Sequence, residues 1–472
     1  MPTHEAGALH AQLQAPAWLE VPRDVNALLR PLWPRTAFKA DDAVLQVGGI
    51  AAPELARQVG TPAYIVDEAD FRGRALEFKN AFEAAFAPLG GARVHYAAKA
   101  LITIGVAGWL AQDGLALDVC SEGELEIALR AGVAPELITA HGSNKPDAYL
   151  ARALAAGAGR IVVDSLPEID QVARLARAGG SGPAPVMLRC SIGIEAHTHE
   201  FIATSHEDQK FGLSAADGSV LEAARRVAAA PELALLGLHS HIGSQIFDVA
   251  AFAQAIERLG GLTARVEADL AASLPELGLG GGFGVAYTTG HDPMPVPRVA
   301  RGMADLVGRV CGRYGIAPPH VTVEPGRAIA GPAGITLYTV GVVKPVALAG
   351  GLSRLYVSVD GGMSDNIRAA LYGADYSATL ASRRSQAPPR LARVVGIHCE
   401  SGDIVVKDEY LPADIAPGDL LAVPVTGAYC HSMASNYNQT PRPPVVAVRD
   451  GLAAVLVRRE TAADLLARDL YA

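Results

Sequence analysis

Cysteine is scarce in this chain, and blocks of basic residues are missing. The 472 residues include only five cysteines, which are widely spaced and form no CxxC pair: Cys120, Cys190, Cys311, Cys399 and Cys430. This pattern suits reduced thiols and argues against a disulfide framework or a structural zinc site. The net charge is −9 and no run of Lys and Arg appears, so nucleic acid is excluded as a partner.

Long apolar runs are missing as well. No uninterrupted apolar segment reaches membrane-spanning length, and residues 1–20 lack the basic start and apolar core of a signal peptide. We therefore expect a cytoplasmic protein with no membrane partner. Half of the residues are apolar, which in a chain of this length is enough to build the cores of two domains.

The segment from Arg93 to Arg327 alternates between short apolar runs and amphipathic stretches. Helix-like stretches such as 122–132 and 166–180 end in glycines that suit helix C-caps. Eight apolar runs end in polar or glycine-rich residues: 93–100, 115–121, 137–143, 160–165, 186–193, 235–243, 276–284 and 320–327. Strand and helix alternating eight times predict a (β/α)₈ TIM-type barrel.

The chain changes character after about residue 330, where β-rich runs are punctuated by Gly, Pro and Asp. This predicts a separate C-terminal β-domain, a sandwich or small barrel. We expect four regions: an N-terminal lead at 1–35, a segment at 36–66 that contributes to the β-domain, the barrel at 67–330 and the β-domain at 331–472.

One lysine lies at the end of the first predicted barrel strand. The stretch "RVHYAAKALI" (93–102) surrounds Lys99 with small and apolar residues, so we expect it to be buried. An ammonium removed from water has a lowered pKa, which makes the neutral amine available as a nucleophile. The alternative is a stem that packs along the strand end while the head reaches solvent. Because the active site of a TIM barrel gathers at the carboxyl ends of its strands, the position favours the nucleophile.

Glycines follow the seventh predicted strand, in "LGLGGGFG". Their bare backbone could approach a phosphate closely, or it could serve a tight turn with positive φ. The residues are Gly280, Gly281, Gly282 and Gly284. Val285 occupies the last glycine position of the GxGxxG pattern, so a dinucleotide is a poor ligand.

The eighth predicted strand ends in "EPGR". Glu324 and Arg327 could form a plain surface salt bridge. At a barrel mouth, Glu324 could instead hold a proton on a ring nitrogen, while Gly326 could add to a phosphate site.

Histidines mark two further stretches. His239 and His241 end the sixth strand as an HxH pair, which can ligate a metal; alternatively one imidazole stacks on a flat ring while Ser244 bonds a phosphate oxygen. A hydrophilic loop holds three more histidines among acidic residues: His197, His199 and His206. We expect no metal at either place, because an ordinary polar barrel loop explains the second stretch equally well.

Two stretches of the β-rich half are unusual for strand ends. "HCESGD" (398–403) sets Cys399 beside Glu400, and "GAYCHSMASNYN" (427–438) sets Tyr429 among small residues. An inert thiol and ordinary strand packing are the alternatives.

Taken together, these motifs resemble the fold-type III pyridoxal-phosphate decarboxylases, most closely those that act on diaminopimelate. "HYAAKA", "HSHIGSQ", "GGGFG", "EPGRAIAG", "VDGGMSDNIRAALYGA", "HCESGD" and "GAYCHSMASNYN" occur in that family's order and span roughly residues 60–445. The lead before residue 35 lies outside the resemblance.

The resemblance implies pyridoxal 5'-phosphate as cofactor and a role for each motif residue. Lys99 would form the internal aldimine, His241 would stack on the ring, Glu324 would pair with the pyridine nitrogen and Cys399 would be the proton donor. The phosphate would be surrounded by Ser244, Gly282, Gly326 and Tyr429, and Gly281 and Arg327 would also bind the cofactor. The substrate would be bound by Arg327, Arg368, Tyr372, Glu400 and Tyr429.

The resemblance also implies a substrate and an assembly. Arg327 and Arg368 would repel the terminal ammonium of ornithine or lysine but accept the distal carboxylate of meso-diaminopimelate, so we expect decarboxylation to L-lysine and CO₂, the last step of lysine biosynthesis. In that family each site is completed by a neighbouring subunit, so we expect a homodimer with shared active sites. The alternatives are a racemase, a decarboxylase of another basic amino acid, and a non-catalytic regulator that binds the cofactor.

Overall fold

The computed structural model describes residues 14–180, 182–193 and 210–471, and the chain folds as two compact units. The barrel unit consists of residues 72–284 and 293–328. The β-unit consists of the chain up to Phe71, residues 285–292 and the chain from Ile329 onward. Each unit is described below by itself.

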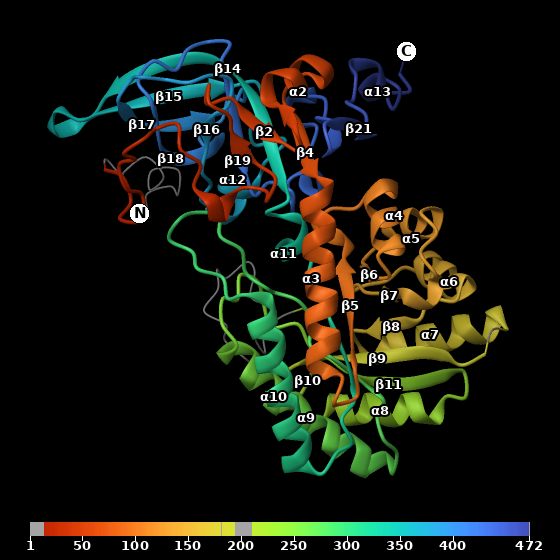
Figure 1. The fold of residues 1–472 in the computed structure, drawn as a ribbon. Coiled ribbons are helices and arrows are strands. Elements are labelled where there is room, and N and C mark those ends of the chain that lie inside the picture. Colours follow the sequence, from red (N-terminus) through yellow and green to blue (C-terminus); the bar gives the residue numbers. More distant parts are fainter. Residues whose placement is uncertain (1–13, 181, 194–209, 472) are drawn as a thin grey trace. The chain divides into compact units, whose positions relative to one another are not determined.

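A closed ring of eight parallel strands forms the core of the barrel unit (Figure 1). The strands are β5 (Ala92–Ala97), β6 (Ala116–Val119), β7 (Ile138–Ala140), β8 (Arg160–Val163), β9 (Ala184–Ser191), β11 (Leu233–His239), β12 (Glu276–Gly278) and β13 (His320–Val323). The ring closes where β13 pairs with β5 and where β8 pairs with β9. A short strand, β10 (Leu213–Ser214), pairs in parallel with the end of β9. All eight predicted strands and the TIM-type barrel are confirmed.

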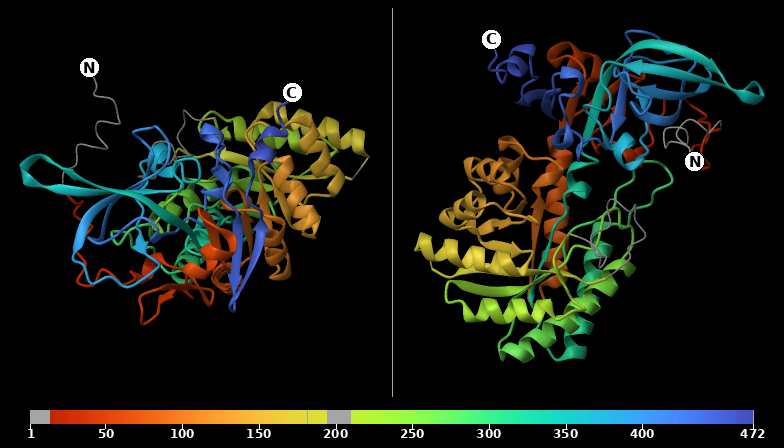
Figure 2. Two further views of the ribbon diagram at one scale, coloured as in Figure 1. Left: turned by 90° about the horizontal axis from the view of Figure 1, so that it is seen from above. Right: turned by 180° about the vertical axis from the view of Figure 1, so that it is seen from behind.

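Helices surround the strand ring on the outside, as the views of Figure 2 show. They are α3 (Glu68–Phe86), α4 (Ile104–Gln112), α5 (Glu122–Arg130), α6 (Asp147–Ala156), α7 (Leu166–Gly179), α8 (Ser219–Ala229), α9 (Ala250–Leu270) and α10 (Val296–Tyr314). Each buries an apolar stripe; α10, for example, buries Val299, Met303 and Val307. This packing holds the strand ends in fixed positions.

Local capping explains where several of these helices begin and end. Thr103 accepts a hydrogen bond from the N–H of Val106 at the start of α4, and Ser121 accepts one from the N–H of Glu124 at the start of α5. The Glu124 carboxylate receives the N–H of Cys120 at 2.6 Å, one residue before the cap. These caps fix the loops that follow β5 and β6.

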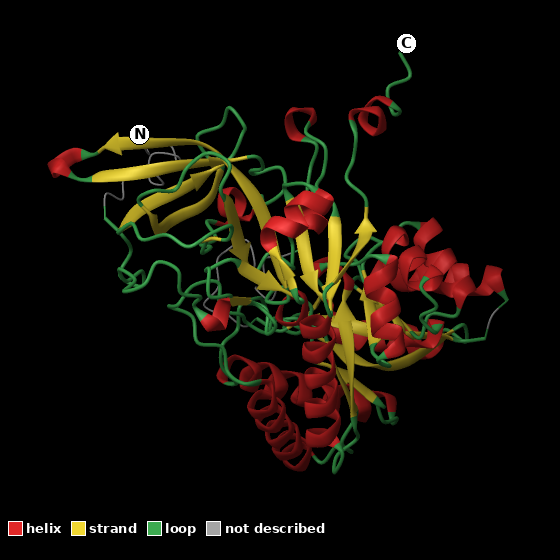
Figure 3. Cartoon of the chain, turned by 45° about the horizontal axis from the view of Figure 1, so that its top comes forward, coloured by secondary structure: helices red, strands yellow, loops and turns green. Residues whose placement is uncertain are grey.

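The β-unit contains a large sheet, and β14 is central in its strand order. Figure 3 draws the strands of the chain in yellow. Its strands are β4 (Ala63–Asp67), β14 (Gly334–Ala347), β15 (Ser353–Val359), β16 (Thr379–Leu380), β17 (Pro389–Val395), β18 (Ile404–Pro412), β19 (Leu420–Pro424), β20 (Val445–Arg449) and β21 (Leu452–Val457). One half of β14 pairs with β4 and β19, and the other half forms a long hairpin with β15. The predicted β-domain is confirmed.

Smaller elements complete the β-unit. A three-stranded sheet is formed by β1 (Phe38–Lys39), β2 (Leu45–Val47) and β3 (Ile50–Ala51), and the helices are α2 (Ala52–Val59), α12 (Arg368–Tyr372) and α13 (Ala462–Leu466). A four-residue helix, α11 (Arg327–Ala330), carries the chain out of the barrel.

The described part of the N-terminal lead is irregular but fastened to the β-unit. Asn26 exchanges two hydrogen bonds of 2.9 Å with the backbone of Ser385, and the carbonyl of Trp18 accepts a bond from Thr289. The lead lines a hollow of about 800 Å³ together with Glu409 and Tyr410. Among the described residues, no helix combines the length and the apolar character needed to cross a membrane.

Candidate active site

Lys99 lies in the turn η2 (Ala98–Ala100) that directly follows β5. Its neighbours Ala98 and Ala100 are buried, but Lys99 itself is exposed, so our expectation of a buried lysine was wrong. The reason is its place after the strand end, where the side chain leaves the packed core. Its charge acts on the neighbouring groups: burial, and after it the charge of Lys99, lower the pKa of His241 well below the usual value.

His241 follows β11 and is fixed in orientation by the backbone. Its Nδ1 atom accepts a hydrogen bond of 3.0 Å from the N–H of Gly281. Because its pKa is low, the ring is neutral at physiological pH. A neutral ring held at one nitrogen is a suitable platform for another flat ring.

Glu324 follows β13 and shares one carboxylate oxygen between two imidazoles. Oε1 lies 2.9 Å from Nε2 of His239 and 3.3 Å from Nε2 of His141. Burial raises the pKa of Glu324, but the charges and hydrogen bonds of the two histidines outweigh burial and hold the pKa well below its usual range. The other oxygen, Oε2, makes no hydrogen bond within the described residues and is available to a ligand.

The HxH pair therefore does not act as one ligand set. His239 faces Glu324, whereas His241 faces Gly281. The ligand atoms of His141, His239 and Glu324 lie within 4.8 Å of one another. The hydrogen bond between His239 and Glu324 and the ion-pair contact between His141 and Glu324 account for this spacing, and Nε2 of His141 makes no hydrogen bond within the described residues. The predicted histidine loop, with His197, His199 and His206, lies outside the described residues.

The predicted glycines pack where any side chain would collide. A Cβ on Gly281 would lie 2.3 Å from the carbonyl oxygen of Glu324, and Gly282, at φ +97°, would place one 2.5 Å from that of Gly243. Gly326 packs in the same way against Ala97, next to the Lys99 turn. The backbones of three barrel loops thus approach one another closely.

Backbone donors remain available in these loops. Among the described residues of these loops, the backbone N–H groups of Gly243, Ser244, Gly282 and Gly326 donate to no other protein group. Converging free N–H groups form an anion site. Arg327 is buried beside them and donates from Nη2 to Oγ of Ser244 at 2.8 Å.

The barrel residues fit pyridoxal phosphate. Free backbone N–H groups suit its phosphate, and the Lys99 amine suits its aldehyde. The neutral ring of His241 suits its flat ring. The ionised carboxylate of Glu324 has one oxygen left for the N–H of the pyridine ring. This donor set matches the chemistry of the cofactor at each position.

Arg368, in the β-unit, is enclosed by tyrosines. Its Nε donates to the hydroxyl of Tyr376 at 2.9 Å. Its guanidinium carbon lies 5.2 Å from the ring centre of Tyr287, 5.7 Å from that of Tyr372 and 5.6 Å from that of Tyr429. We call Arg368 with these four tyrosines the arginine cage. No carboxylate of the described residues pairs with Arg368, so its charge is available to an anion.

Cys399 and Glu400 lie in a loop that Asp403 holds in shape. The Asp403 carboxylate accepts the N–H groups of Met363 and His398 at 2.6 and 2.7 Å. Cys399 and Glu400 are exposed, and Glu400 accepts a short hydrogen bond from the Tyr437 hydroxyl.

Three residues that contact Glu324 or Arg368 were not predicted from the sequence: His141, Tyr287 and Tyr376. His141 directly follows the third barrel strand, so its strand-end position was a usable signal. The two tyrosines reach Arg368 from separate segments, and nothing in the local sequence indicates this.

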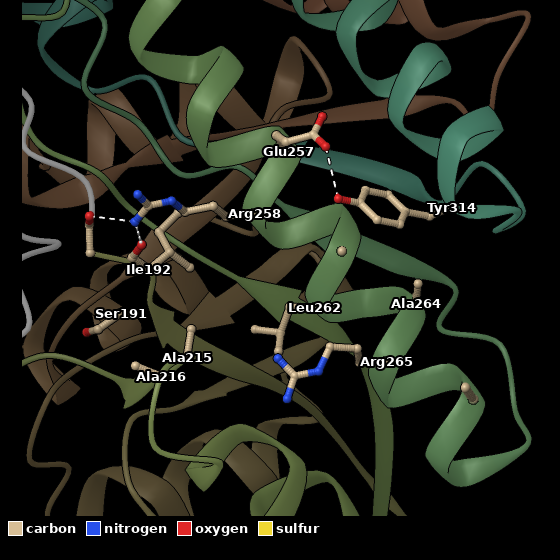
Figure 4. Close-up of a pocket in the computed structure, with 13 residues that line it drawn as sticks. Ser191, Ile192, Ala215, Ala216, Glu257, Arg258, Leu262, Ala264, Arg265 and Tyr314 are labelled. Carbon is tan, nitrogen blue, oxygen red and sulfur yellow. Dashed lines mark hydrogen bonds between the residues drawn. The ribbon is translucent and has the colours of Figure 1, made fainter.

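A second hollow in the barrel unit, about 650 Å³ in volume, lies beside α9 and the end of β9 (Figure 4). Arg258 donates there to the carbonyl of Ile192, and Tyr314 donates to Glu257 at 2.9 Å. None of the predicted site residues lines this hollow, so it is separate from the candidate site.

The fold and the barrel residues define a pyridoxal-phosphate enzyme, and comparison with known proteins agrees. The family model for the pyridoxal-binding domain of pyridoxal-dependent decarboxylases matches residues 71–331. A curated diaminopimelate decarboxylase of Mycobacterium tuberculosis is 50% identical over 443 residues, covering 93% of this chain and 98% of the relative. That of Bacillus subtilis is 43% identical over 426 residues, covering 90% and 95%.

A solved structure shows the same likeness. The crystal structure of diaminopimelate decarboxylase from M. jannaschii in complex with L-lysine has a TM-score of 0.85 and 28% identity, and the match covers 93% of this chain and 99% of that one. The chain belongs to the pyridoxal-dependent decarboxylases and, within them, to the diaminopimelate decarboxylases.

Proposed function

We propose that this protein removes CO₂ from the D-centre of meso-2,6-diaminopimelate and releases L-lysine, the last step of lysine biosynthesis. The observation that carries the reaction type is Glu324, an ionised carboxylate with one free oxygen. When bound, pyridoxal phosphate supplies an electron-poor ring that takes up the electron pair left behind by CO₂. Glu324 supports this chemistry because it holds a proton at the ring nitrogen.

Other barrel residues bind and orient. Lys99 would hold the cofactor through its amine, and His241, whose low pKa keeps the ring neutral, would pack on the cofactor ring. Ser244, Gly281, Gly282 and Gly326 line the phosphate site, and Arg327 adds a positive charge there or at the substrate. Tyr429 joins them from the β-unit.

The substrate choice rests on the arginine cage. Arg368 keeps an unpaired charge among rings, which favours a carboxylate at the distal end of the substrate and disfavours a bare ammonium. Tyr372 borders this position, Glu400 can bind the distal ammonium, and Cys399 donates the proton that replaces CO₂.

We further propose a homodimer with shared active sites. Cys399 and Glu400 are exposed in the single chain and belong to the β-unit, whereas Lys99 belongs to the barrel unit. A partner chain that supplies this loop would bury it and complete the site. The described cysteines are free thiols, which suits a reducing compartment, so we place the enzyme in the cytoplasm.

A substrate comparison tests this function. Purified enzyme loaded with pyridoxal phosphate receives meso-diaminopimelate, ornithine or L-lysine, and both CO₂ and the amino-acid product are measured. We expect equal amounts of CO₂ and L-lysine from meso-diaminopimelate and turnover at least about 100-fold slower with the other two. Comparable CO₂ release from ornithine or L-lysine would contradict the proposed substrate, and racemisation without CO₂ would contradict the reaction.

A further inference from the structure

Two histidines from separate strands converge on the same oxygen of Glu324. His239 ends β11 and His141 follows β7, and both present Nε2 to Oε1. We propose that His141 and His239 are positioning residues that hold Oε1 of Glu324 and leave Oε2 for the ring nitrogen of pyridoxal phosphate. The inference rests on the proposed function, because that function places the ring nitrogen at Glu324.

The pKa values of the two histidines are shifted in opposite directions. Burial lowers the pKa of His239 below its usual value, so it acts as a neutral donor. Burial acts in the same direction on His141, but the Asp118 and Glu324 carboxylates outweigh it and raise the pKa. His141 is therefore the imidazole that holds a proton more readily beside Glu324, whereas His239 supplies a neutral hydrogen bond.

The surroundings of His141 support this assignment. Asp118 on β6 brings Oδ1 to 3.7 Å from His141 Nε2, while the His239 ring from β11 meets the His141 ring edge to face at 5.0 Å. Arg189 on β9 is the opposing charge and lowers the pKa of His141. Asp118 and Glu324 together favour the charged form of His141 more than Arg189 disfavours it.

The proton of His239 is assigned by its contacts. Its Nδ1 atom is buried and has no hydrogen-bond partner among residues 14–180, 182–193 and 210–471, so the ring's single proton serves Nε2. A glutamine can replace such a neutral donor, because its amide N–H reaches a similar position. A glutamine cannot replace a charged imidazole. The two histidines should therefore respond differently to the same substitution.

The experiment compares His141→Gln and His239→Gln in the holoenzyme, each loaded with cofactor carrying ¹⁵N in the ring. Nitrogen NMR across pH reports whether the ring nitrogen is protonated, independently of turnover. For His141→Gln we expect the pH of deprotonation to fall by about one unit or more and kcat to fall about tenfold, with KM changed less than about twofold. For His239→Gln, we expect the pH at which the ring nitrogen loses its proton, and kcat, to stay close to the values of the unmutated enzyme.

Two further variants make the result interpretable. His95→Gln is the matched control, because this buried barrel histidine bonds to Oγ1 of Thr139 at 3.0 Å instead of Glu324, and it should leave the ring nitrogen unchanged. Glu324→Gln is the positive control and should lower the pH of deprotonation further than His141→Gln.

Each other outcome overturns the proposal. An unchanged ring nitrogen in His141→Gln, with a shift in Glu324→Gln, would overturn it and leave the proposed function intact. No shift in either variant would overturn both, because Glu324 would not face the ring. Equal shifts in all three histidine variants would overturn the proposal as well, because the shift would then not depend on contact with Glu324. If His141→Gln does not fold, neutron diffraction of the unmutated holoenzyme decides: deuterium on both nitrogens of His141 supports the proposal, and a neutral ring overturns it.

Discussion

A guanidinium surrounded by phenol rings differs from one in an ion pair, because its charge is still available. In this chain Arg354 is the contrasting case: it is buried against the carboxylate of Asp408 at 2.8 Å and is already neutralised. Arg368 is buried to a similar degree, but its neighbours are rings and one hydroxyl. At the scale of single residues, the proposed substrate preference therefore depends on one feature: no carboxylate of the described residues pairs with Arg368.

Substitutions in the arginine cage should affect substrate binding. Arg368→Ala should raise KM for diaminopimelate about 10- to 100-fold, because a charge-assisted hydrogen bond to the distal carboxylate is lost. Tyr376→Phe removes the acceptor that orients Nε and should raise KM about two- to fivefold. Tyr356→Phe, beside Arg393 in the same unit, is the control and should leave KM unchanged. Steady-state kinetics measure all three, and an unchanged KM in Arg368→Ala would remove this residue from the substrate site.

Secondary-structure elements were largely predictable, and contacts between them were not. Eight apolar runs ending in polar residues predicted eight strands, because burial on both faces leaves a clear pattern in the sequence. The meeting of His141 with Glu324, or of Tyr287 with Arg368, depends on how distant segments pack, which no local pattern records. The exposure of Lys99 was missed for the same reason: its apolar neighbours are buried, and it is not.

Buried carboxylates shape the turns that carry the β-unit's functional loops. Asp365 accepts the N–H of Gly362 at 2.7 Å and the hydroxyl of Tyr338. Burial raises its pKa to about 7, helped by the neighbouring charges of Asp403 and Asp360. The folded state therefore holds a proton at Asp365 more tightly than the unfolded chain does, and ionising Asp365 costs stability.

This raised pKa predicts a stability loss as pH rises. Asp365 is protonated in both states below about pH 4, and its contribution is lost progressively between pH 4 and about pH 7, by on the order of 4 kcal/mol. Asp365→Asn should flatten the decline of the urea midpoint over this window. Asp464→Asn is the control: its exposed carboxylate has a lowered pKa, so it titrates below the window. If the urea midpoint falls equally steeply with pH in Asp365→Asn and in the unmutated protein, Asp365 does not titrate between pH 4 and about pH 7.

At the largest scale, the residues proposed for catalysis belong to two different units of the chain. Lys99 and Glu324 belong to the barrel unit, whereas Arg368, Cys399 and Glu400 belong to the β-unit. In the proposed dimer, a two-fold axis would give each barrel the exposed Cys399 loop of its partner, which is how this loop could reach the barrel residues.

Mixing two inactive variants tests this arrangement. Lys99→Ala and Cys399→Ala chains should each be nearly inactive, but after unfolding together and refolding, half of the dimers are mixed. Each mixed dimer then has one site with both lesions and one with neither, so about a quarter of all sites should regain CO₂ release. If mixed dimers are demonstrated and no activity returns, each site is built within one chain.

Lys99 is proposed to bind pyridoxal phosphate at the barrel mouth, and borohydride reduction shows which lysine holds the cofactor. Reduction fixes the cofactor to the lysine that binds it, and mass spectrometry of the peptides identifies that residue. We expect the cofactor's visible absorption band to disappear and the added mass to lie on Lys99, with none on Lys145, a buried lysine of the same unit that pairs with Glu168 at 2.6 Å. Label on any lysine other than Lys99, or a lost band with no labelled peptide, would contradict the account.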